Sequence, residues 1–293
     1  MTHKIAFLFP GQGGLPDSLP PASDEIEELF RIAEDHDLPL RDWIREGNTD
    51  RLARTDAAQP AILIDSLARA AALQRAGFEP NLVAGHSLGE FAALAVCGVL
   101  DPVETLELVL KRGRLMAAVS GAMAAVVKLD LETVTRLCAV AGPDVVVANH
   151  NGHRQVVVSG TEEAVGRVSE AAEREGGRGI RLNVSGPFHS PFMEPSRGAL
   201  ATWIDKTSFS SPAVPFVSAV TGETEETPER IRDLMRGQMT ACVRWVGVID
   251  RLVECHVTEA VEVGAGKVLT GMSTRITDAI EFRTYEEVLD GTL

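Results

Sequence analysis

The chain has 293 residues, and 45% of them are hydrophobic, which is enough for one large core or for a large core and a small one. Its formal net charge of -14 at pH 7 opposes binding to nucleic acids, because affinity for polyanions comes largely from lysine and arginine. No apolar run approaches the roughly 18 residues of a membrane span, and the first apolar run is too short for a signal peptide. We therefore expect a globular, cytoplasmic protein that binds neither nucleic acids nor membranes.

Strand-like and helical runs alternate over the first 116 residues. The runs, in chain order, are a strand at 4–9, helices at 24–34 and 60–77, a strand at 81–87 and a helix at 102–116. Alternation of this kind indicates an α/β layer architecture around a parallel sheet.

The pattern changes in the middle of the chain. From residue 122 onward the runs read strand, helix, strand, strand, helix, strand, and the "HNGH" at 150–153 carries the Asn-Gly signal of a hairpin turn. The order β-α-β-β-α-β is typical of a ferredoxin-like arrangement. We therefore predict a small domain at 122–187 inserted into a large domain that is formed by 1–121 together with 188–293.

Ser87 lies in "GHSLGE", between a predicted strand and a predicted helix. The pattern G-x-S-x-G in this context is typical of a nucleophile elbow, because glycines have no Cβ to clash in the strained turn. The alternative is a serine with only a structural role in the turn.

A serine hydroxyl needs a base within hydrogen-bond reach to become a good nucleophile. Among the seven histidines, we expect His86 to pack beside the serine or to line the site with its side chain turned away. His189 lies in an irregular stretch where the chain returns from the small domain, and such loops are where catalytic groups collect. Spacing favours His189 without excluding the others, which we expect at the surface or in a strand (His3, His36, His150, His153 and His256).

Eight motifs spread over nearly the whole chain resemble, in order, those of the malonyl-CoA:acyl carrier protein transacylases. They are "FPGQG", "QPAI", "GHSLGE", "KRGRLM" followed by "GAMAAV", "ANHNGHRQVVVSG", "FHSPFM", "RGQMTACVRW" and "VGAGKVLTGM". The resemblance implies an α/β-hydrolase-like large domain with an inserted ferredoxin-like small domain. It also implies transfer of a malonyl group from malonyl-CoA to the phosphopantetheine thiol of an acyl carrier protein. No metal and no tightly bound cofactor is implied, and the four cysteines form no C-x-x-C pair.

The resemblance also implies roles for individual residues. Ser87 would take the acyl group, His189 would act as the base, and the backbone carbonyl of Gln238 would orient His189. The backbone N–H groups of Gln12 and Leu88 would form the oxyanion hole, which stabilises the tetrahedral intermediate by roughly 3 kcal/mol for one donor.

The resemblance changes the interpretation of Arg112 more than that of any other residue. On its own it reads as a solvated cation near a helix end, but the resemblance places it opposite Ser87, where its guanidinium can hold the free carboxylate of a malonyl group. Phe188 would narrow the acyl pocket. Further residues that match family positions lining or supporting the cleft are Met116, Gln59, His86, Asn151 and Gln155.

Other functions remain open at this point. A serine esterase or thioesterase would favour an acyl pocket without a buried cation, and a non-catalytic interaction protein would need none of these residues. Leu15, where the family has a polar residue, and the short segment 116–121 are departures that suit a discrete acyltransferase of polyketide synthesis better than the enzyme of fatty-acid synthesis. A trans-acting polyketide acyltransferase for a different or larger acyl group is a further alternative. Candidate residues for docking an acidic carrier protein are Lys111, Arg114, Arg154, Arg181, Lys267 and Arg275.

Overall fold

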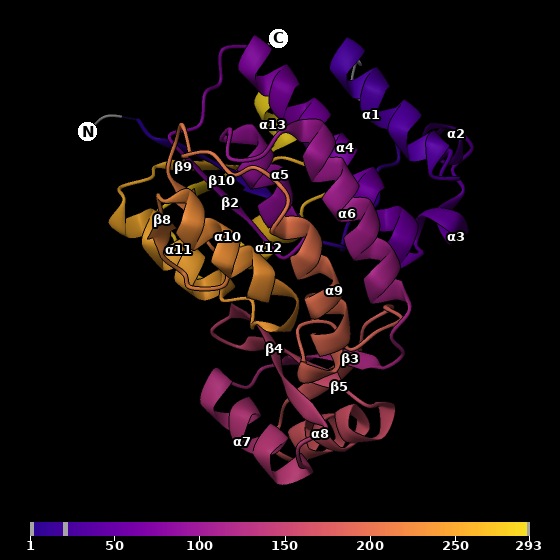
Figure 1. The fold of residues 1–293 in the computed structure, drawn as a ribbon. Coiled ribbons are helices and arrows are strands. Elements are labelled where there is room, and N and C mark those ends of the chain that lie inside the picture. The colour runs from indigo at the N-terminus through magenta and orange to yellow at the C-terminus, as the bar shows by residue number, and fades with distance from the viewer. Residues whose placement is uncertain (1–2, 20–22, 292–293) are drawn as a thin grey trace.

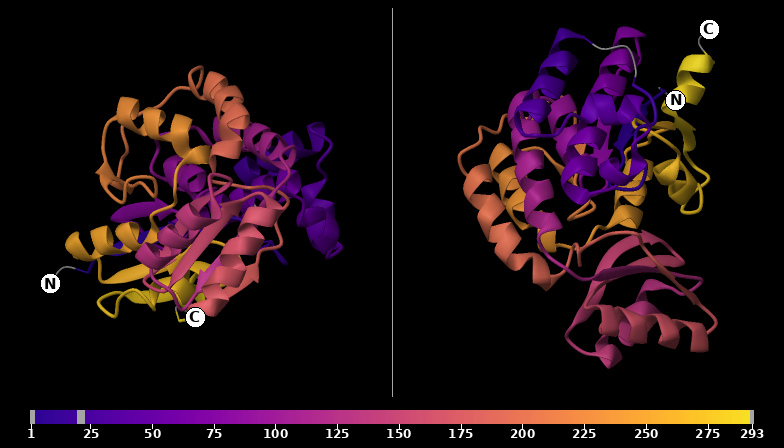
Figure 2. Two further views of the ribbon diagram at one scale, coloured as in Figure 1. Left: turned by 90° about the horizontal axis from the view of Figure 1, so that it is seen from below. Right: turned by 90° about the vertical axis from the view of Figure 1, so that its right-hand side faces the viewer.

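The computed structural model describes residues 3–19 and 23–291, and it contains two β-sheets with helices packed on them (Figure 1). The larger sheet lies in the upper part of Figure 1, and the smaller sheet lies at the opposite end from both chain ends. The right-hand view of Figure 2 shows the smaller sheet and its two helices as a separate lobe below the rest. No described helix combines the length and apolar character that a membrane crossing requires.

The larger sheet has six strands in the order β10-β9-β1-β2-β7-β8. Its strands are β1 (Ile5–Phe9), β2 (Leu82–Gly85), β7 (Phe216–Val217), β8 (Thr224–Glu225), β9 (Glu259–Glu262) and β10 (Glu281–Thr284). Neighbouring strands are parallel except β7 and β8, which are antiparallel. The prediction of a parallel sheet is therefore wrong at this edge, because the connection from β7 to β8 is too short for the crossover that parallel strands need.

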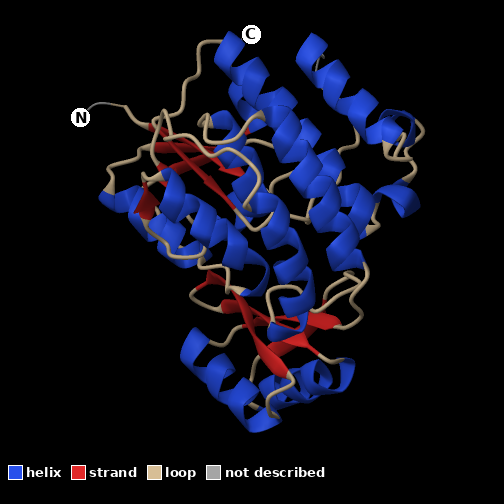
Figure 3. Ribbon diagram, in the orientation of Figure 1, coloured by secondary structure: helices blue, strands red, loops and turns tan. Residues whose placement is uncertain are grey.

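Helices cover both faces of this sheet (Figure 3). In β1, Phe7 and Phe9 belong to one core cluster, whereas Ala6 and Leu8 belong to another on the opposite face, as the two-residue period of a strand requires. Burial on both faces explains why β1, β2 and β7 consist of apolar residues and glycine throughout. The helices of this part are α1 (Asp24–Asp35), α2 (Leu40–Arg45), α3 (Thr49–Leu52), α4 (Thr55–Arg75), α5 (Gly89–Val96), α6 (Pro102–Ala117), α9 (Glu194–Ile204), α10 (Pro228–Gly237), α11 (Trp245–Glu254), α12 (Val268–Ser273) and α13 (Tyr285–Asp290).

The smaller sheet is antiparallel, with the order β4-β5-β3-β6. Its elements follow in the predicted chain order and are β3 (Ala122–Val127), α7 (Leu131–Ala141), β4 (Val145–Gly152), β5 (Gln155–Gly160), α8 (Glu162–Arg174) and β6 (Arg178–Arg181). One face packs on α7 and α8, whereas Met123, Ala125 and Val157 on the other face join the core of the larger part. The face of the smaller sheet that α7 and α8 do not cover thus packs against the larger part of the molecule.

The hairpin between β4 and β5 differs from the prediction. Asn151 and Gly152 still belong to β4, where Gly152 pairs with Gln155, and the turn consists of His153 and Arg154. Two register shifts in β4 accommodate the extra residues, as β-bulges do.

Strand β4 is also joined to the larger part of the molecule by backbone hydrogen bonds. The N–H of Val243 donates to the carbonyl oxygen of Ala148 at 2.9 Å, and the N–H of His150 donates to the carbonyl oxygen of Val243 at 2.8 Å. These bonds form a parallel bridge between Asn149 and Val243, just before α11.

Candidate active site

Ser87 lies on the turn between β2 and α5, as the sequence predicts. Its φ of +54° is rare for a residue with a side chain and is the strained conformation of a nucleophile elbow. A Cβ on Gly85 would overlap the backbone of Gly89, and a Cβ on Gly89 would overlap the carbonyl oxygen of Phe9. Both glycines are therefore required for the turn to pack against β1.

Replacing Gly89 with alanine should lower the free energy of unfolding by about 3 kcal/mol, because the new methyl group meets backbone atoms that cannot move independently. Urea unfolding would measure the change. The matched control is Gly198→Ala in α9, where a Cβ meets nothing within 4 Å and should raise stability by up to about 1 kcal/mol. Equal stability of the wild-type and Gly89→Ala proteins would contradict this reading of the elbow.

His189 is the histidine that contacts the serine. Its Nε2 lies 2.7 Å from the Oγ of Ser87. Its Nδ1 lies 2.9 Å from the carbonyl oxygen of Ala241 and 3.2 Å from that of Gln238. Because carbonyl oxygens only accept hydrogen bonds, Nδ1 carries the proton and Nε2 is left to accept from Ser87. Gln238 thus lies where the resemblance implies, but Ala241, which the sequence did not indicate, is the nearer partner.

The environment of His189 keeps its imidazole neutral. Burial lowers the pKa of His189 to about 3, and the positive charge of Arg112 and the nearby His86 act in the same direction. At neutral pH the ring is therefore in the form that can accept a proton from the serine hydroxyl.

Arg112 of α6 is buried, with a relative exposure of 1%, and its guanidinium meets only neutral groups. Its Nη1 donates to the Oε1 of Gln59 at 2.7 Å, and its Nη2 donates to the Oγ of Ser87 and to the Oε1 of Gln238, both at 3.1 Å. Its Nε has no hydrogen-bond partner, and no carboxylate in residues 3–19 and 23–291 forms an ion pair with it. The solvated position read from the residues alone is wrong, since Arg112 lies on the face of α6 that packs on α4, whereas Arg114 lies on the exposed face.

Burial lowers the pKa of Arg112 to about 10, although the negative charge of Glu90 acts in the opposite direction. The side chain therefore remains a cation at neutral pH. A buried cation that lacks a directly paired anion is costly, so the site is suited to a ligand that carries a carboxylate.

Glu90, three residues after the nucleophile, is a site residue that the sequence analysis left without a role. Its Oε2 accepts a hydrogen bond from the Nε2 of Gln238 at 2.8 Å, and its Oε1 accepts from Ser218 and Ala219. The same Nε2 of Gln238 donates to the carbonyl oxygen of Ser87 at 2.7 Å. Burial raises the pKa of Glu90. The motif "GHSLGE" contains this residue, but only the fold reveals that it is buried against Gln238.

A cavity of about 240 Å³ opens beside Ser87 and His189. Predicted residues that line it are Gln12, His86, Asn151, Gln155 and Phe188. His86 contacts the Oδ1 of Asn151 through its Nε2 at 2.9 Å, and its ring lies 5.5 Å from that of Trp245. Lining residues that the sequence did not indicate come from the smaller sheet and its exit (Met123, Ala125, Asn149, Val157, Leu182 and Val184) and from α12 and its start (Val268, Leu269 and Met272).

Gln59 and Met116 do not line this cavity, and neither does Arg112. Gln59 and Met116 are buried, and the Nε2 of Gln59 lies 3.3 Å from the Sδ of Met116. The Oε1 of Gln59 accepts the hydrogen bond from Arg112. They lie behind the nucleophile because α4 and α6 pack on each other there, so their contacts support Arg112. Leu15 is also absent from the lining and packs half-buried against the main core.

The loop of Gln12 lies directly against the elbow. A Cβ on Gly11 would come within 2.7 Å of the carbonyl oxygen of His86. The backbone N–H groups of Gln12 and Leu88 have no hydrogen-bond acceptor within the part of the chain that the structure describes. Two free donors thus lie next to Ser87, where an oxyanion would form.

Comparisons with known proteins agree with this geometry. A model of the family described as "Acyl transferase domain" matches residues 6–285. The malonyl CoA-acyl carrier protein transacylase of Escherichia coli strain K12 is 35% identical, over 97% of this chain and 96% of the relative. The crystal structure of the acyl-carrier-protein-S-malonyltransferase of Bartonella henselae has a TM-score of 0.90 and 34% identity, and covers 98% of this chain and 99% of its own.

A further solved structure contains a malonyl-transacylase in complex with its type II PKS acyl-carrier protein. It has a TM-score of 0.89 and 34% identity, and the match covers 96% of this chain and 95% of that chain. Both the sequence relatives and the solved structures match almost from end to end. The chain therefore belongs to the acyltransferase family of the malonyl CoA-acyl carrier protein transacylases.

Proposed function

We propose that this protein transfers a malonyl group from malonyl-CoA to the phosphopantetheine thiol of an acyl carrier protein, through an acyl-enzyme on Ser87. The observation that carries the proposal is the buried guanidinium of Arg112, which forms no ion pair in the described part of the chain and whose Nη2 lies 3.1 Å from the Oγ of Ser87. A plain esterase has no use for a cation at this position, whereas a malonyl group brings the carboxylate that the cation lacks.

In the first half of the reaction, the Oγ of Ser87 attacks the thioester carbonyl while the Nε2 of His189 accepts the hydroxyl proton. The N–H groups of Gln12 and Leu88 stabilise the oxyanion. The carbon–sulfur bond then breaks, and the proton on His189 passes to the CoA sulfur. The carbonyl oxygens of Gln238 and Ala241 accept from Nδ1, so they keep the imidazole of His189 in line with Ser87 and stabilise its protonated form during the transfer.

In the second half, the thiol of the carrier's phosphopantetheine attacks the ester of Ser87. His189 accepts the thiol proton and returns it to the Oγ of Ser87 as the ester bond breaks. Throughout, the malonyl carboxylate stays on the guanidinium of Arg112, which Gln59 and Gln238 hold in place. The chemistry uses side chains and backbone amides, so the proposal includes no metal and no tightly bound cofactor.

The proposal extends to the architecture and the location. We assign an α/β-hydrolase-like large domain to 1–121 and 188–293 and a ferredoxin-like small domain to 122–187. The parallel strands with helices on both faces support the first assignment, and the β-α-β-β-α-β order supports the second. The cytoplasm is the proposed location.

Brief exposure to malonyl-CoA should add one malonyl group to the protein, as measured by intact-mass spectrometry. The adduct should be absent from the Ser87→Ala protein and should move to a phosphopantetheinylated carrier protein when this is added. The reason is that Ser87 is the only hydroxyl held on the imidazole of His189 in the described part of the chain.

Two results would contradict the proposal. An adduct that forms with another acyl-CoA but not with malonyl-CoA would overturn the role of Arg112. Rapid loss of the malonyl adduct to water in the presence of the carrier would indicate a thioesterase.

A further inference from the structure

A second and larger hollow adjoins the cavity at Ser87. Its volume is about 760 Å³, and it shares Asn151, Gln155 and Met272 with that cavity. The other lining residues are Val127, Lys128, Gly152, His153, Arg154, Gly176 and Arg275. The two spaces therefore adjoin at these residues, with Ser87 lining the inner one and the β4–β5 turn lining the outer one.

The outer hollow is positively charged in a strongly acidic protein. Lys128, Arg154 and Arg275 line it together with His153, and no aspartate or glutamate is among its lining residues. The chain as a whole has 42 acidic and 28 basic residues. A concentration of cations next to the catalytic cavity therefore favours an anionic ligand at this place.

Two of these cations, Lys128 and Arg275, form no ion pairs with other described residues of the protein. Within residues 3–19 and 23–291, the side chains of Lys128 and Arg275 form no ion pair and no hydrogen bond. By contrast, Lys111 is paired with Glu107, and Arg181 is paired with Glu162.

Two other candidate docking residues are less suited to an anion. Arg114 donates to the carbonyl oxygen of His36. Lys267 lines a different hollow together with Asp17, Glu286 and Glu287, whose charges oppose an anionic ligand. Of the basic residues that the sequence indicated, Arg154 and Arg275 are thus the two that line a space without acidic residues.

The rim of the outer hollow is held in shape. Lys128 has a φ of +71°, a strained value for a residue with a side chain. Arg154 donates from both its Nε and its Nη2 to the carbonyl oxygen of Lys128, which fixes the turn after β3 against the β4–β5 turn. Lys128 is exposed, and Nη1 of Arg154 forms no hydrogen bond or ion pair in the described residues, although the charge of Asp130 acts on this guanidinium.

We infer that this hollow binds the phosphate at the far end of the phosphopantetheine arm. The inference rests on the proposed function. In a ping-pong reaction the donor and the acceptor occupy the same cavity in turn, and CoA and the holo-carrier both end their pantetheine arm in a phosphate. One cluster, formed by Lys128, Arg154 and Arg275, therefore serves both substrates.

The test compares substrates with and without the phosphate in a Lys128→Ala/Arg275→Ala double variant. Arg154 is left in place because its guanidinium also holds the turn. The second-order rate constant for acylation of Ser87 by malonyl-CoA should fall roughly tenfold, as should that for transfer to a holo-carrier. Acylation by malonyl-pantetheine, and transfer to free pantetheine, should be unchanged.

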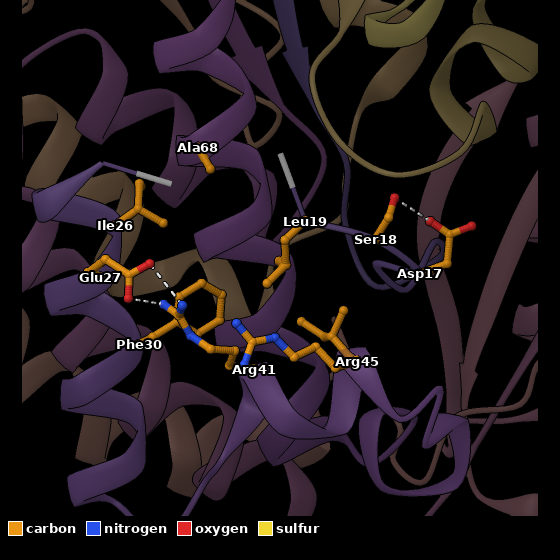
Figure 4. Close-up of a pocket in the computed structure, with 10 residues that line it drawn as sticks. Asp17, Ser18, Leu19, Ile26, Glu27, Phe30, Arg41, Arg45 and Ala68 are labelled. Carbon is orange, nitrogen blue, oxygen red and sulfur yellow. Dashed lines mark hydrogen bonds and ion pairs between the residues drawn. The ribbon is translucent and has the colours of Figure 1, made fainter. Parts of the chain in front are cut away.

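Arg45→Ala is the matched control. Arg45 is an exposed cation without an ion pair in the described ranges, and it lines a hollow of about 440 Å³ between α1 and α2 that shares no residue with the cavity at Ser87. In that hollow Arg41 is turned toward Glu27 (Figure 4). This variant should leave all four rate constants unchanged.

The other outcomes overturn the inference. A fall for all four reactions would mean that the double variant reshapes the cleft, and no fall would mean that the cations do not meet the substrate. A fall for malonyl-CoA alone would assign the cluster to the nucleotide part of CoA. A fall for the carrier alone would assign it to the surface of the carrier protein.

Equilibrium binding separates this inference from the proposed function. Calorimetry with Ser87→Ala protein should show that CoA binds roughly tenfold more weakly after the double substitution, whereas pantetheine binding is unchanged. This result would support the phosphate site even if no malonyl adduct formed on the wild-type protein. Equal binding of CoA to both proteins would overturn the site even if malonyl transfer proceeded.

Discussion

Replacing His189 with alanine should lower the rate of Ser87 acylation by about 10² to 10⁴-fold. The Oγ of Ser87 has two hydrogen-bond partners in the described structure, the Nε2 of His189 and the Nη2 of Arg112. Because a guanidinium only donates hydrogen bonds, only His189 can accept the serine proton. Rapid-quench mass spectrometry with malonyl-CoA would measure the rate of adduct formation.

His36→Ala is the control for this substitution. His36 follows α1, contacts Glu107 and Arg114, and takes no part in the cavity at Ser87, so its loss should change the acylation rate by less than about twofold. Acylation that proceeds at the wild-type rate in His189→Ala protein would remove His189 from the role of base.

The pH dependence follows from the same geometry. His189 accepts a proton only in its neutral form, and its pKa is lowered to about 3 by burial and then by Arg112. The acylation rate should therefore hold as the pH falls through 6.5, the ordinary pKa of histidine, and decline only at considerably lower pH.

Replacing Arg112 with methionine should lower acylation by malonyl-CoA by roughly 10² to 10³-fold, but acylation by acetyl-CoA by less than about tenfold. Breaking a buried ion pair costs about 3 to 5 kcal/mol, and each 1.4 kcal/mol is a factor of ten. An acetyl group has no carboxylate, so acylation by acetyl-CoA loses only the hydrogen bond by which Arg112 orients Ser87. Parallel rate measurements with the two donors give the ratio.

Two further readouts distinguish the carboxylate clamp from a general structural role. Arg112→Lys should restore part of the malonyl rate, because the charge returns without the planar fork. Loss of the positive charge should also raise the pKa of His189, so the decline at low pH should begin at a higher pH in the Arg112→Met protein. Equal losses with malonyl-CoA and acetyl-CoA would contradict the clamp.

The elbow could be predicted because its signal is local. Gly85 and Gly89 each lie two positions from Ser87, between a predicted strand and a predicted helix, although the contact that excludes a side chain at Gly89, with Phe9 of β1, is visible only in the fold. The alternation of strands and helices is local in the same sense, since it follows from the apolar face of each element.

The support of the site could not be predicted in this way. Gln238 and Glu90 are separated by 148 positions, and His189 and Ala241 by 52. No periodicity in the sequence connects such residues, so their contacts depend on how the sheets and helices pack. The resemblance to known transacylases indicated Gln238, whereas the nearer carbonyl, that of Ala241, became evident only in the folded chain.

The hairpin of the smaller sheet shows the limit of a turn signal. Asn151 and Gly152 form a favourable turn pair, yet they remain in β4 because bulges shift the register and carry the strand two residues further. The pairing with β5 outweighs the local preference. As a result Asn151 lies at the cavity beside Ser87, with its side chain on His86.

The backbone bridge between β4 and Val243 joins the smaller sheet to the segment that supports the base. Val243 follows Ala241 by two residues, and the carbonyl of Ala241 holds His189 in line with Ser87. We therefore expect that a displacement of β4 at this edge, with these hydrogen bonds kept, would also displace the support of the base. A bulky acyl group that pushed the two sheets apart would thus react slowly for two reasons. It would fit the cavity poorly, and it would move His189 out of line with Ser87.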